Sequence, residues 1–251
     1  MLKVVLEPNF IQPGNVFSLP LDYRTGFMSI IKSAFQSESP IDYDLVFNRR
    51  TVKPYTFAVA FGDDVKVQDE KIYFNRPLEF KFSSFDLNDE ILLYNYFVRS
   101  KTIKIFGRDF DVSNLWIFEN KKIKGNSAIF KTLSPVLIRS HKNEKFYLCP
   151  KCENFDGDEA FYEALKFNVS ELVRNLLGRE VSGEINFKPV KTRRVVVKHL
   201  TDRGNLKLPG FTGLFLFEAE SEVLNLILRA GLGARRSQGF GMLELVYEVS
   251  R

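Results

Sequence analysis

The sequence has few of the residues that build the commonest catalytic and structural sites: two cysteines and two histidines in 251 residues. Two cysteines cannot form the disulfide framework of a small secreted domain, so we expect thiols in a reducing, cytoplasmic compartment. The apolar runs are far shorter than the roughly 20 residues of a membrane-spanning helix. We therefore expect a soluble protein without a membrane partner.

The residues that are abundant indicate a folded chain. Hydrophobic residues make up 45% of the sequence, with 25 phenylalanines, and this apolar content excludes intrinsic disorder of the whole chain. The length suits one or two domains. A net charge of +5 permits a polyanionic partner without demonstrating one.

Hydrophobic periodicity predicts the same element order in both halves, which is strand, helix, two strands, helix, strand. In the first half the strands are residues 2–7, 55–61, 78–85 and a last pair at 102–106 and 110–118, with helices from Asp22 and from Asp86. In the second half the strands are 128–139, 183–188 with 190–200, 211–219 and 242–249, with helices ending at Gly178 and Ala230. This order predicts an α+β chain of two tandem ferredoxin-like (RRM-like, βαββαβ) domains, 1–122 and 123–251, on either side of a polar, basic segment at 120–127.

A glycine-rich segment, residues 231–241, is the most specific feature of the sequence. It is no dinucleotide fingerprint, because Arg236 occupies the third glycine position and the segment leads from a helix to a strand. Glycines permit close backbone approach, and exposed amides beside arginines suit a phosphate. We predict that it binds substrate through Gly231, Gly233, Arg235, Arg236, Ser237, Gly239 and Gly241; the alternative is a tight turn that happens to be basic.

A second basic segment runs over residues 188–203 and contains one acidic residue, Asp202. It predicts a β-hairpin that presents a ribbon of cations to a phosphate backbone. The predicted contacts are Lys191, Arg193, Arg194 and Lys198. The alternative is a solvated strand edge protected by charge.

The sequence resembles the CRISPR-associated endoribonucleases of the Cas six family, in the RAMP superfamily. The resemblance rests on the glycine-rich segment ending Gly239-Phe240-Gly241, and extends to residues 130–136, 161–168 and 209–213, and more weakly to 19–20 and 53–57. It implies a tandem ferredoxin-like fold that binds CRISPR repeat RNA and cuts precursor CRISPR RNA within its repeats, without a cofactor. It also implies that the basic hairpin contacts the repeat RNA.

The histidine that this family usually carries in its first domain is absent here, and alignment puts Phe47 in its place. Lys53 matches the lysine that closes the family's active segment. We expect Lys53 to be catalytic, with Tyr23 or Lys32 for proton transfer or phosphate contact, and Arg49 and Arg50 to bind substrate nearby. Three interpretations remain: a histidine-free nuclease, a family member that binds repeat RNA without cutting it, or a RAMP subunit that needs the other subunits of a CRISPR effector complex.

The remaining candidates carry weaker signals. Cys149 and Cys152 have the spacing of half a zinc knuckle, but no second pair follows, so we expect no metal. His141 and His199 are more typical of structural or solvated residues than of catalytic ones. We expect RNA cleavage by attack of a 2′-hydroxyl, independent of divalent metal, by a monomer or homodimer.

Overall fold

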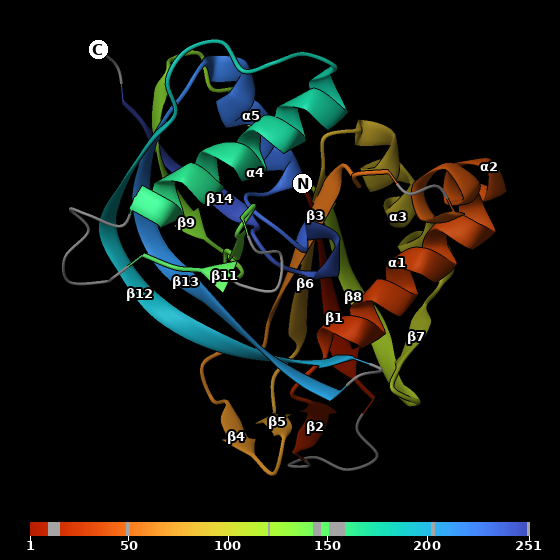
Figure 1. Cartoon of the computed structure of the whole chain (residues 1–251). Helices are drawn as coiled ribbons and strands as arrows, with labels where there is room; N and C mark the ends of the chain where they lie inside the picture. The colour runs from red at the N-terminus through yellow and green to blue at the C-terminus, as the bar shows by residue number, and fades with distance from the viewer. Residues whose placement is uncertain are drawn as a thin grey trace.

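The chain folds as two antiparallel sheets, each covered by helices (Figure 1). The structure, a computed structural model, describes residues 1–9, 16–48, 51–119, 121–142, 147–150, 159–201 and 204–249, with the backbone alone at 199–201, 204 and 205. No helix in these ranges is long and apolar enough to cross a membrane.

The first sheet has the strand order β3-β6-β1-β8-β7, and every neighbouring pair is antiparallel. Its elements are β1 (Leu2–Pro8), β3 (Tyr55–Ala60), β6 (Leu78–Ser84), β7 (Thr102–Ile105), β8 (Arg108–Ile117), α1 (Arg24–Glu38) and α3 (Leu87–Arg99). The two helices bury apolar faces against the strands in one core that is rich in phenylalanine. Without the edge strand β7, the order is that of a ferredoxin-like βαββαβ domain.

The second sheet repeats this order as β12-β13-β9-β14. Its elements are β9 (Ser127–Thr132), β12 (Asn186–Thr201), β13 (Gly204–Glu218), β14 (Leu243–Glu248), α4 (Glu159–Leu177) and α5 (Ser221–Ala230). Both helices contribute to a second core. The expected α+β fold of two tandem ferredoxin-like domains is therefore confirmed.

Short elements complete the chain. They are β2 (Phe17–Pro20), β4 (Lys66–Gln68) and β5 (Lys71–Phe74) in one small sheet, β10 (Ile138–Arg139) paired with β11 (Tyr147–Leu148), the helix α2 (Pro40–Tyr43), the π-helical turn η1 (Asp44–Asn48) and the 3-10 turn η2 (Arg236–Gln238). The small sheet was not predicted, because its strands are only three or four residues long.

The hairpin of β12 and β13 is longer than the sequence suggested. The strands predicted at 183–188 and 190–200 form one strand with a bulge between Pro189 and Lys191, and residues 204–210 continue β13 through Pro209. Since β12 is an edge strand, a proline, a bulge and a row of charges are features expected there. The hairpin curves across the molecule to the first half, where Lys198 pairs with Glu70 at 3.4 Å (Figure 1).

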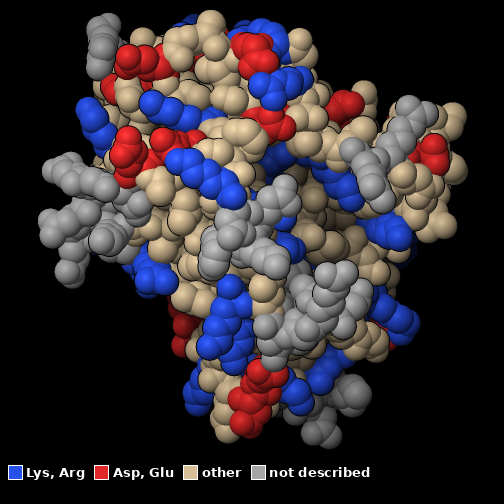
Figure 2. Space-filling model, in the orientation of Figure 1, with Lys and Arg blue, Asp and Glu red and all other residues tan. Residues whose placement is uncertain are grey.

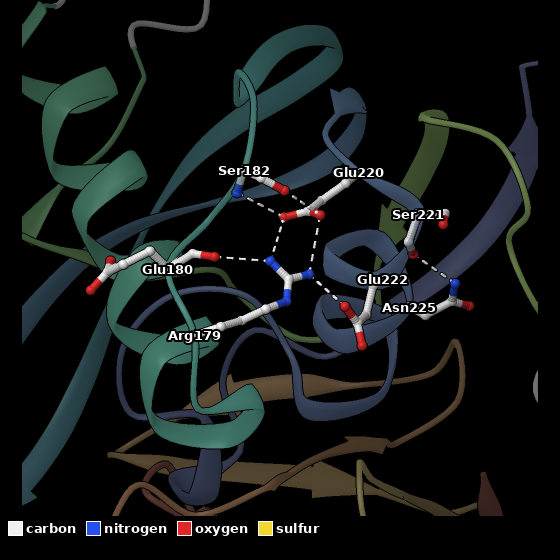
Figure 3. A network of polar contacts seen from close by, with 7 residues as sticks. All are labelled: Arg179, Glu180, Ser182, Glu220, Ser221, Glu222 and Asn225. Atoms are coloured by element: carbon white, nitrogen blue, oxygen red, sulfur yellow. Dashed lines mark hydrogen bonds and ion pairs between the residues drawn. The ribbon is translucent and has the colours of Figure 1, made fainter.

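Polar contacts fix the junction of α4 and α5 in the second half (Figure 3). The Arg179 guanidinium, just beyond α4, donates to both carboxylate oxygens of Glu220 at 2.9 and 3.1 Å and to Glu222. Ser182 adds an N–H and an O–H to Glu220. Asn225 exchanges two hydrogen bonds with the backbone of Ile123, which belongs to the second core. Because Ile123 packs in the second core, we propose that the boundary between the two domains lies between residues 122 and 123.

The two halves are joined by the glycine-rich segment. The Arg24 side chain of α1 donates to the Gly239 carbonyl at 3.2 Å, and the Thr56 hydroxyl of β3 donates to the Phe240 carbonyl at 2.8 Å. The Arg24 guanidinium also lies over the Phe240 ring, 4.6 Å from its centroid. Arg24, Thr56 and Phe240 are buried, so the segment holds the halves in a fixed arrangement.

Candidate functional site

A pocket of about 450 Å³ lies where the two halves meet. Lys53 lines it from the segment before β3, while Arg139 and His141 line it from the end of β10 and beyond. Phe167 of α4 and the stretch Gly233 to Ser237 complete the wall. Figure 2 shows a hollow right of centre with blue side chains around it.

Positive charge dominates this pocket. Among its lining residues the cations are Lys53, Arg139, Arg235 and Arg236, and the one carboxylate is Glu171. That carboxylate accepts a hydrogen bond from Arg174, so its charge is already paired. The pocket therefore suits an anion such as a phosphodiester.

Lys53 is half-buried in a cluster of aromatic rings. Its Nζ atom lies 4.3 Å from the centroid of the Phe47 ring, which stacks on Tyr43 at 5.2 Å. Burial, and then the positive charge of Lys32, lower the pKa of Lys53. Lys32 itself is exposed on α1, with its Nζ 5.8 Å from the Tyr43 ring centroid. Two predicted catalytic residues, Lys53 and Lys32, are thus neighbours.

Phe47 is held in place by apolar contacts. It packs edge-on against Phe35 of α1, at 5.4 Å between ring centroids, as well as on Tyr43. The short turns α2 and η1 bring Phe47 back against α1 and beside Lys53. A phenyl ring exchanges no proton, so the position that alignment assigned to an imidazole here offers only packing and a π face for the lysine.

The third predicted catalytic residue, Tyr23, lies apart from this cluster. Tyr23 precedes α1, and nine residues of helix separate it from Lys32, about 13 Å along the axis. Its ring contacts Phe61 at 4.8 Å and the Arg24 guanidinium at 4.6 Å. Tyr23 is not among the residues that line the pocket with Lys53. Arg49 and Arg50 lie outside the described residues.

The glycines of the segment 231–241 allow other parts of the protein to pack closely against its backbone. A Cβ on Gly231 would meet Thr56 at 2.9 Å, one on Gly239 would meet Phe57 at 2.7 Å, and one on Gly241 would meet the Leu232 carbonyl oxygen at 2.1 Å. Their close approach is therefore to the protein itself, which corrects our expectation that these three glycines face a ligand. Gly233 and Ser237 line the pocket, although a Cβ on Gly233 would also meet the protein, at 2.3 Å from the Leu137 carbonyl oxygen.

The two arginines of the segment have different environments. Arg235 is half-buried, and its guanidinium donates to the Tyr147 hydroxyl and to Gln238, both at 2.7 Å. Arg236 is 8% exposed and donates to the Ala230 carbonyl at 2.7 Å, and burial lowers its pKa to about 10. Both arginines were predicted to bind substrate, and for both this stays a prediction. They differ in exposure, because the Arg236 guanidinium is buried in the pocket wall while that of Arg235 is half-buried at the pocket.

The basic hairpin presents its charges to solvent. Lys191, Arg193, Arg194 and Lys198 of β12 are all exposed. Arg193 donates to the Thr212 hydroxyl across the hairpin at 3.2 Å. Blue side chains on the face shown in Figure 2 mark this region above the acidic turn of β4 and β5. The hairpin remains a predicted backbone-binding ribbon.

His141 lines the pocket, although from the sequence we expected it to be a structural or solvated residue. Its ring stacks on Phe167 of α4 at 5.0 Å with an interplanar angle of 24°. Two hydrogen bonds between the Asn168 side chain and the Arg139 backbone join this segment to α4. Only the fold brings residues 53 and 141 to one pocket, so no local pattern of the sequence signals the pairing.

That Cys149 and Cys152 bind no metal stays a prediction. Cys149 is half-buried, and Cys152 lies outside the described residues. Within the part of the chain that the structure describes, no three His, Cys, Asp or Glu side chains gather into a metal site.

Similarity to known proteins covers the whole chain. The profile of the family described as CRISPR associated protein Cas6, C-terminal, matches residues 118–245. No curated protein is significantly similar in sequence. A solved structure described as a Cas6-related gene from Pyrococcus furiosus is 20% identical, with a TM-score of 0.80 over 99% of this chain and 98% of that one. A RAMP protein binding different RNA substrates is 20% identical, with a TM-score of 0.79 over 98% and 99%. A Cas6 product complex is 11% identical, with a TM-score of 0.65 over 98% of both chains.

These matches confirm the fold and, because the family profile spans half of the sequence, they also establish the family. The glycine-rich segment and the basic hairpin fall within the matched region, as do the pocket residues from Arg139 onward, whereas Lys53 lies outside it. This chain belongs to the Cas6 family of CRISPR associated proteins.

Proposed function

We propose that this protein binds CRISPR repeat RNA and cleaves it in the pocket between its halves. One observation carries the proposal: Lys53 and the stretch Gly233 to Ser237, some 180 residues apart in sequence, line the same cationic pocket. The reaction is attack of a 2′-hydroxyl on the adjacent phosphate, which yields a cyclic phosphate and a 5′-hydroxyl and needs no divalent metal.

The lining residues divide the work of such a reaction. The Lys53 ammonium, whose partial burial strengthens its electrostatic interactions, stabilises the charge that develops on the phosphorane. Arg139 and Arg235 are placed to hold the flanking phosphates. The exposed cations of β12 extend this surface and bind the phosphate backbone at a distance from the pocket.

The similar structures support RNA as the ligand. One relative is described as binding different RNA substrates, and another as a Cas6 product complex, and each shares the fold over 98% of this chain. These relatives are at most 20% identical to this chain, so their similarity alone does not establish cleavage. We infer cleavage from the lining of the pocket and from the family.

The proposal is tested with end-labelled repeat RNA under single-turnover conditions in EDTA. Lys53→Ala is expected to slow cleavage by a factor on the order of 10², the typical loss of one charge stabiliser, while the Kd for the repeat stays within a few fold. Lys104→Ala, at an exposed lysine of β7, is the matched control and keeps the wild-type rate. Equal rates for wild type and Lys53→Ala would remove this lysine from the site, and cleavage that requires magnesium would refute the metal-independent mechanism.

A second function is favoured by Phe47. With a phenyl ring packed beside Lys53, the first half offers no imidazole to the pocket, which suits a protein that binds repeat RNA without cutting it, alone or as a subunit of an effector complex. Tight, specific repeat binding by the isolated chain with no cleavage would select this alternative. Binding that appears only with other subunits would select the effector-complex role.

A further inference from the structure

The proposed cleavage needs a group that exchanges protons near neutral pH. Attack by a 2′-hydroxyl requires a base for its proton and an acid for the leaving 5′-oxygen. Lysine side chains in water titrate near 10, too high for an efficient base at pH 7. An imidazole meets the requirement, and the chain has two, at positions 141 and 199.

The fold places one of these imidazoles in the pocket. His141 lines the same cavity of about 450 Å³ as Lys53, although 88 positions separate them in the sequence. This volume lies in the range of roughly 300–1,000 Å³ that is typical of small-ligand sites, and it admits a phosphodiester with its sugars. His141 and Lys53 can therefore reach the same bound group.

The support around His141 fixes the imidazole at the pocket wall. The Phe167 ring lies against it at 5.0 Å, nearly parallel, so one face of the imidazole is covered, while the residue as a whole stays exposed to solvent. The segment that carries it is joined to α4 through Asn168, which donates to the Arg139 carbonyl at 2.8 Å. A ring held by stacking and by its backbone is better positioned than a free surface histidine.

We propose that His141 is a catalytic residue of this site and removes the proton of the attacking 2′-hydroxyl. The inference rests on the proposed function. The O2′–P bond forms as the P–O5′ bond breaks; the 2′-hydroxyl proton passes to the imidazole, and the leaving 5′-oxygen takes a proton from the Lys53 ammonium. Solvent then returns a proton to Lys53 and accepts one from His141. This division gives the second half of the chain the acid–base role for which the first half has no histidine.

The surroundings of His141 are charged on several sides. On α4, Glu163 pairs with the neighbouring Lys142 at 2.6 Å, which balances its charge. The titratable and charged groups around the imidazole are Arg139 and Lys142 on its own segment, Glu163 and Glu171 on α4, Lys53 before β3, and Arg235 and Arg236 on the glycine-rich segment.

The test compares wild type with His141→Phe, which retains a flat ring to stack on Phe167 but exchanges no proton. Single-turnover cleavage of end-labelled repeat RNA in EDTA is followed from about pH 5 to 9, with the Kd measured in parallel. We expect the variant to lose a factor on the order of 10² in rate, together with the acid limb of the wild-type pH–rate profile, and to keep its Kd within a few fold. Lys166→Gln, which removes an exposed charge of α4 next to Phe167 and leaves the imidazole and its charged neighbours intact, is the matched control and stays within about threefold of wild type.

The outcomes separate this inference from the proposed function. If wild type cleaves and His141→Phe cleaves within about threefold with the same pH profile, His141 is not catalytic while the nuclease stands. If wild type binds the repeat but does not cleave it, both the nuclease and this role for His141 are refuted. A His141→Phe protein that has lost binding as well would assign the imidazole to RNA contact and overturn the inference; His141→Gln, assayed for binding alone, checks that such a loss is not caused by the phenyl ring.

Discussion

Gly241 provides a sharp test of how the glycine-rich segment is built. Its φ is +73°, and a Cβ there would lie 2.1 Å from the Leu232 carbonyl oxygen. Left-handed backbone costs an alanine about 1–2 kcal/mol. Relief of the overlap must move two backbone hydrogen bonds, from the Leu232 N–H to the Gly241 carbonyl and from the Gly241 N–H to the Pro135 carbonyl, each worth about 1 kcal/mol. Gly241→Ala is therefore expected to lower the free energy of unfolding by about 3–4 kcal/mol.

Gly107 is the matched control for this prediction. It has almost the same φ, +75°, in the turn between β7 and β8, but nothing lies within 4 Å of its Cβ position. Gly107→Ala should cost only the backbone term of about 1–2 kcal/mol. At slopes of about 1–3 kcal/mol per molar urea, the two variants should differ in unfolding midpoint by about 1–2 M. Equal losses would refute the claim that crowding against Leu232, rather than φ alone, requires glycine at 241.

Three further predictions concern pH, stability and RNA binding. Burial raises the pKa of Asp89 to about 7, against a hydrogen bond from Ser84 that lowers it. Because the folded value lies above the unfolded one, the carboxylate destabilises the fold increasingly as pH rises from about 4 to about 7; Asp89→Asn should remove this dependence and gain up to about 4 kcal/mol at pH 8 in urea unfolding. Arg236→Ala should lower the free energy of unfolding by about 2 kcal/mol or more, because it empties a buried, hydrogen-bonded site. Arg235→Ala should lower it by under about 1 kcal/mol. Similar losses of stability for the two variants in thermal melts would contradict this difference in burial. Replacing Lys191 and Arg193 together by Ala should flatten the slope of log Kd against log salt concentration by about 1.4. This is about 0.7 for each phosphate of a single strand that the hairpin no longer neutralises. An unchanged slope would mean that the hairpin is only a solvated strand edge.

The sequence predicted the fold well because each domain uses local signals that survive in the structure. Helix α3 begins where Asp86 was expected to cap it, and its carboxylate accepts the Asn88 N–H at 2.9 Å. Helix α4 ends just before Gly178, whose φ of +69° suits a helix stop. Strand lengths were less predictable. Residues 204–210 contain Pro209, and a proline argues against a strand in a sequence, yet in the structure these residues pair with β12 as part of the hairpin.

The candidate site was harder to predict because its parts are brought together by the interface between the halves. Residues close in sequence to Lys53 were natural candidates, but helix geometry carries Tyr23 about 13 Å away from Lys32. In the glycine-rich segment, the composition predicted a close approach to the backbone but not which group approaches. Residues of β3 approach Gly231 and Gly239, and backbone carbonyls approach Gly241 and Gly233, although Gly233 also lines the pocket. His141 had no neighbour in sequence to suggest chemistry, and its significance arises only from sharing a cavity with Lys53.

Installing a histidine at position 47 tests whether an imidazole beside Lys53 can replace that of His141. Phe47 lies beside Lys53, so the Phe47→His imidazole would enter the same cluster from the first half. If position is what a catalytic base needs, Phe47→His combined with His141→Phe should recover part of the cleavage that His141→Phe loses, by a factor of about 10 or more in single-turnover rate. The packing of Phe47 between Phe35 and Tyr43 predicts an accompanying loss of about 1–3 kcal/mol in stability, which urea unfolding measures independently. A double variant that stays folded, binds the repeat and remains inactive would mean that an imidazole at position 47 does not reach the scissile phosphate.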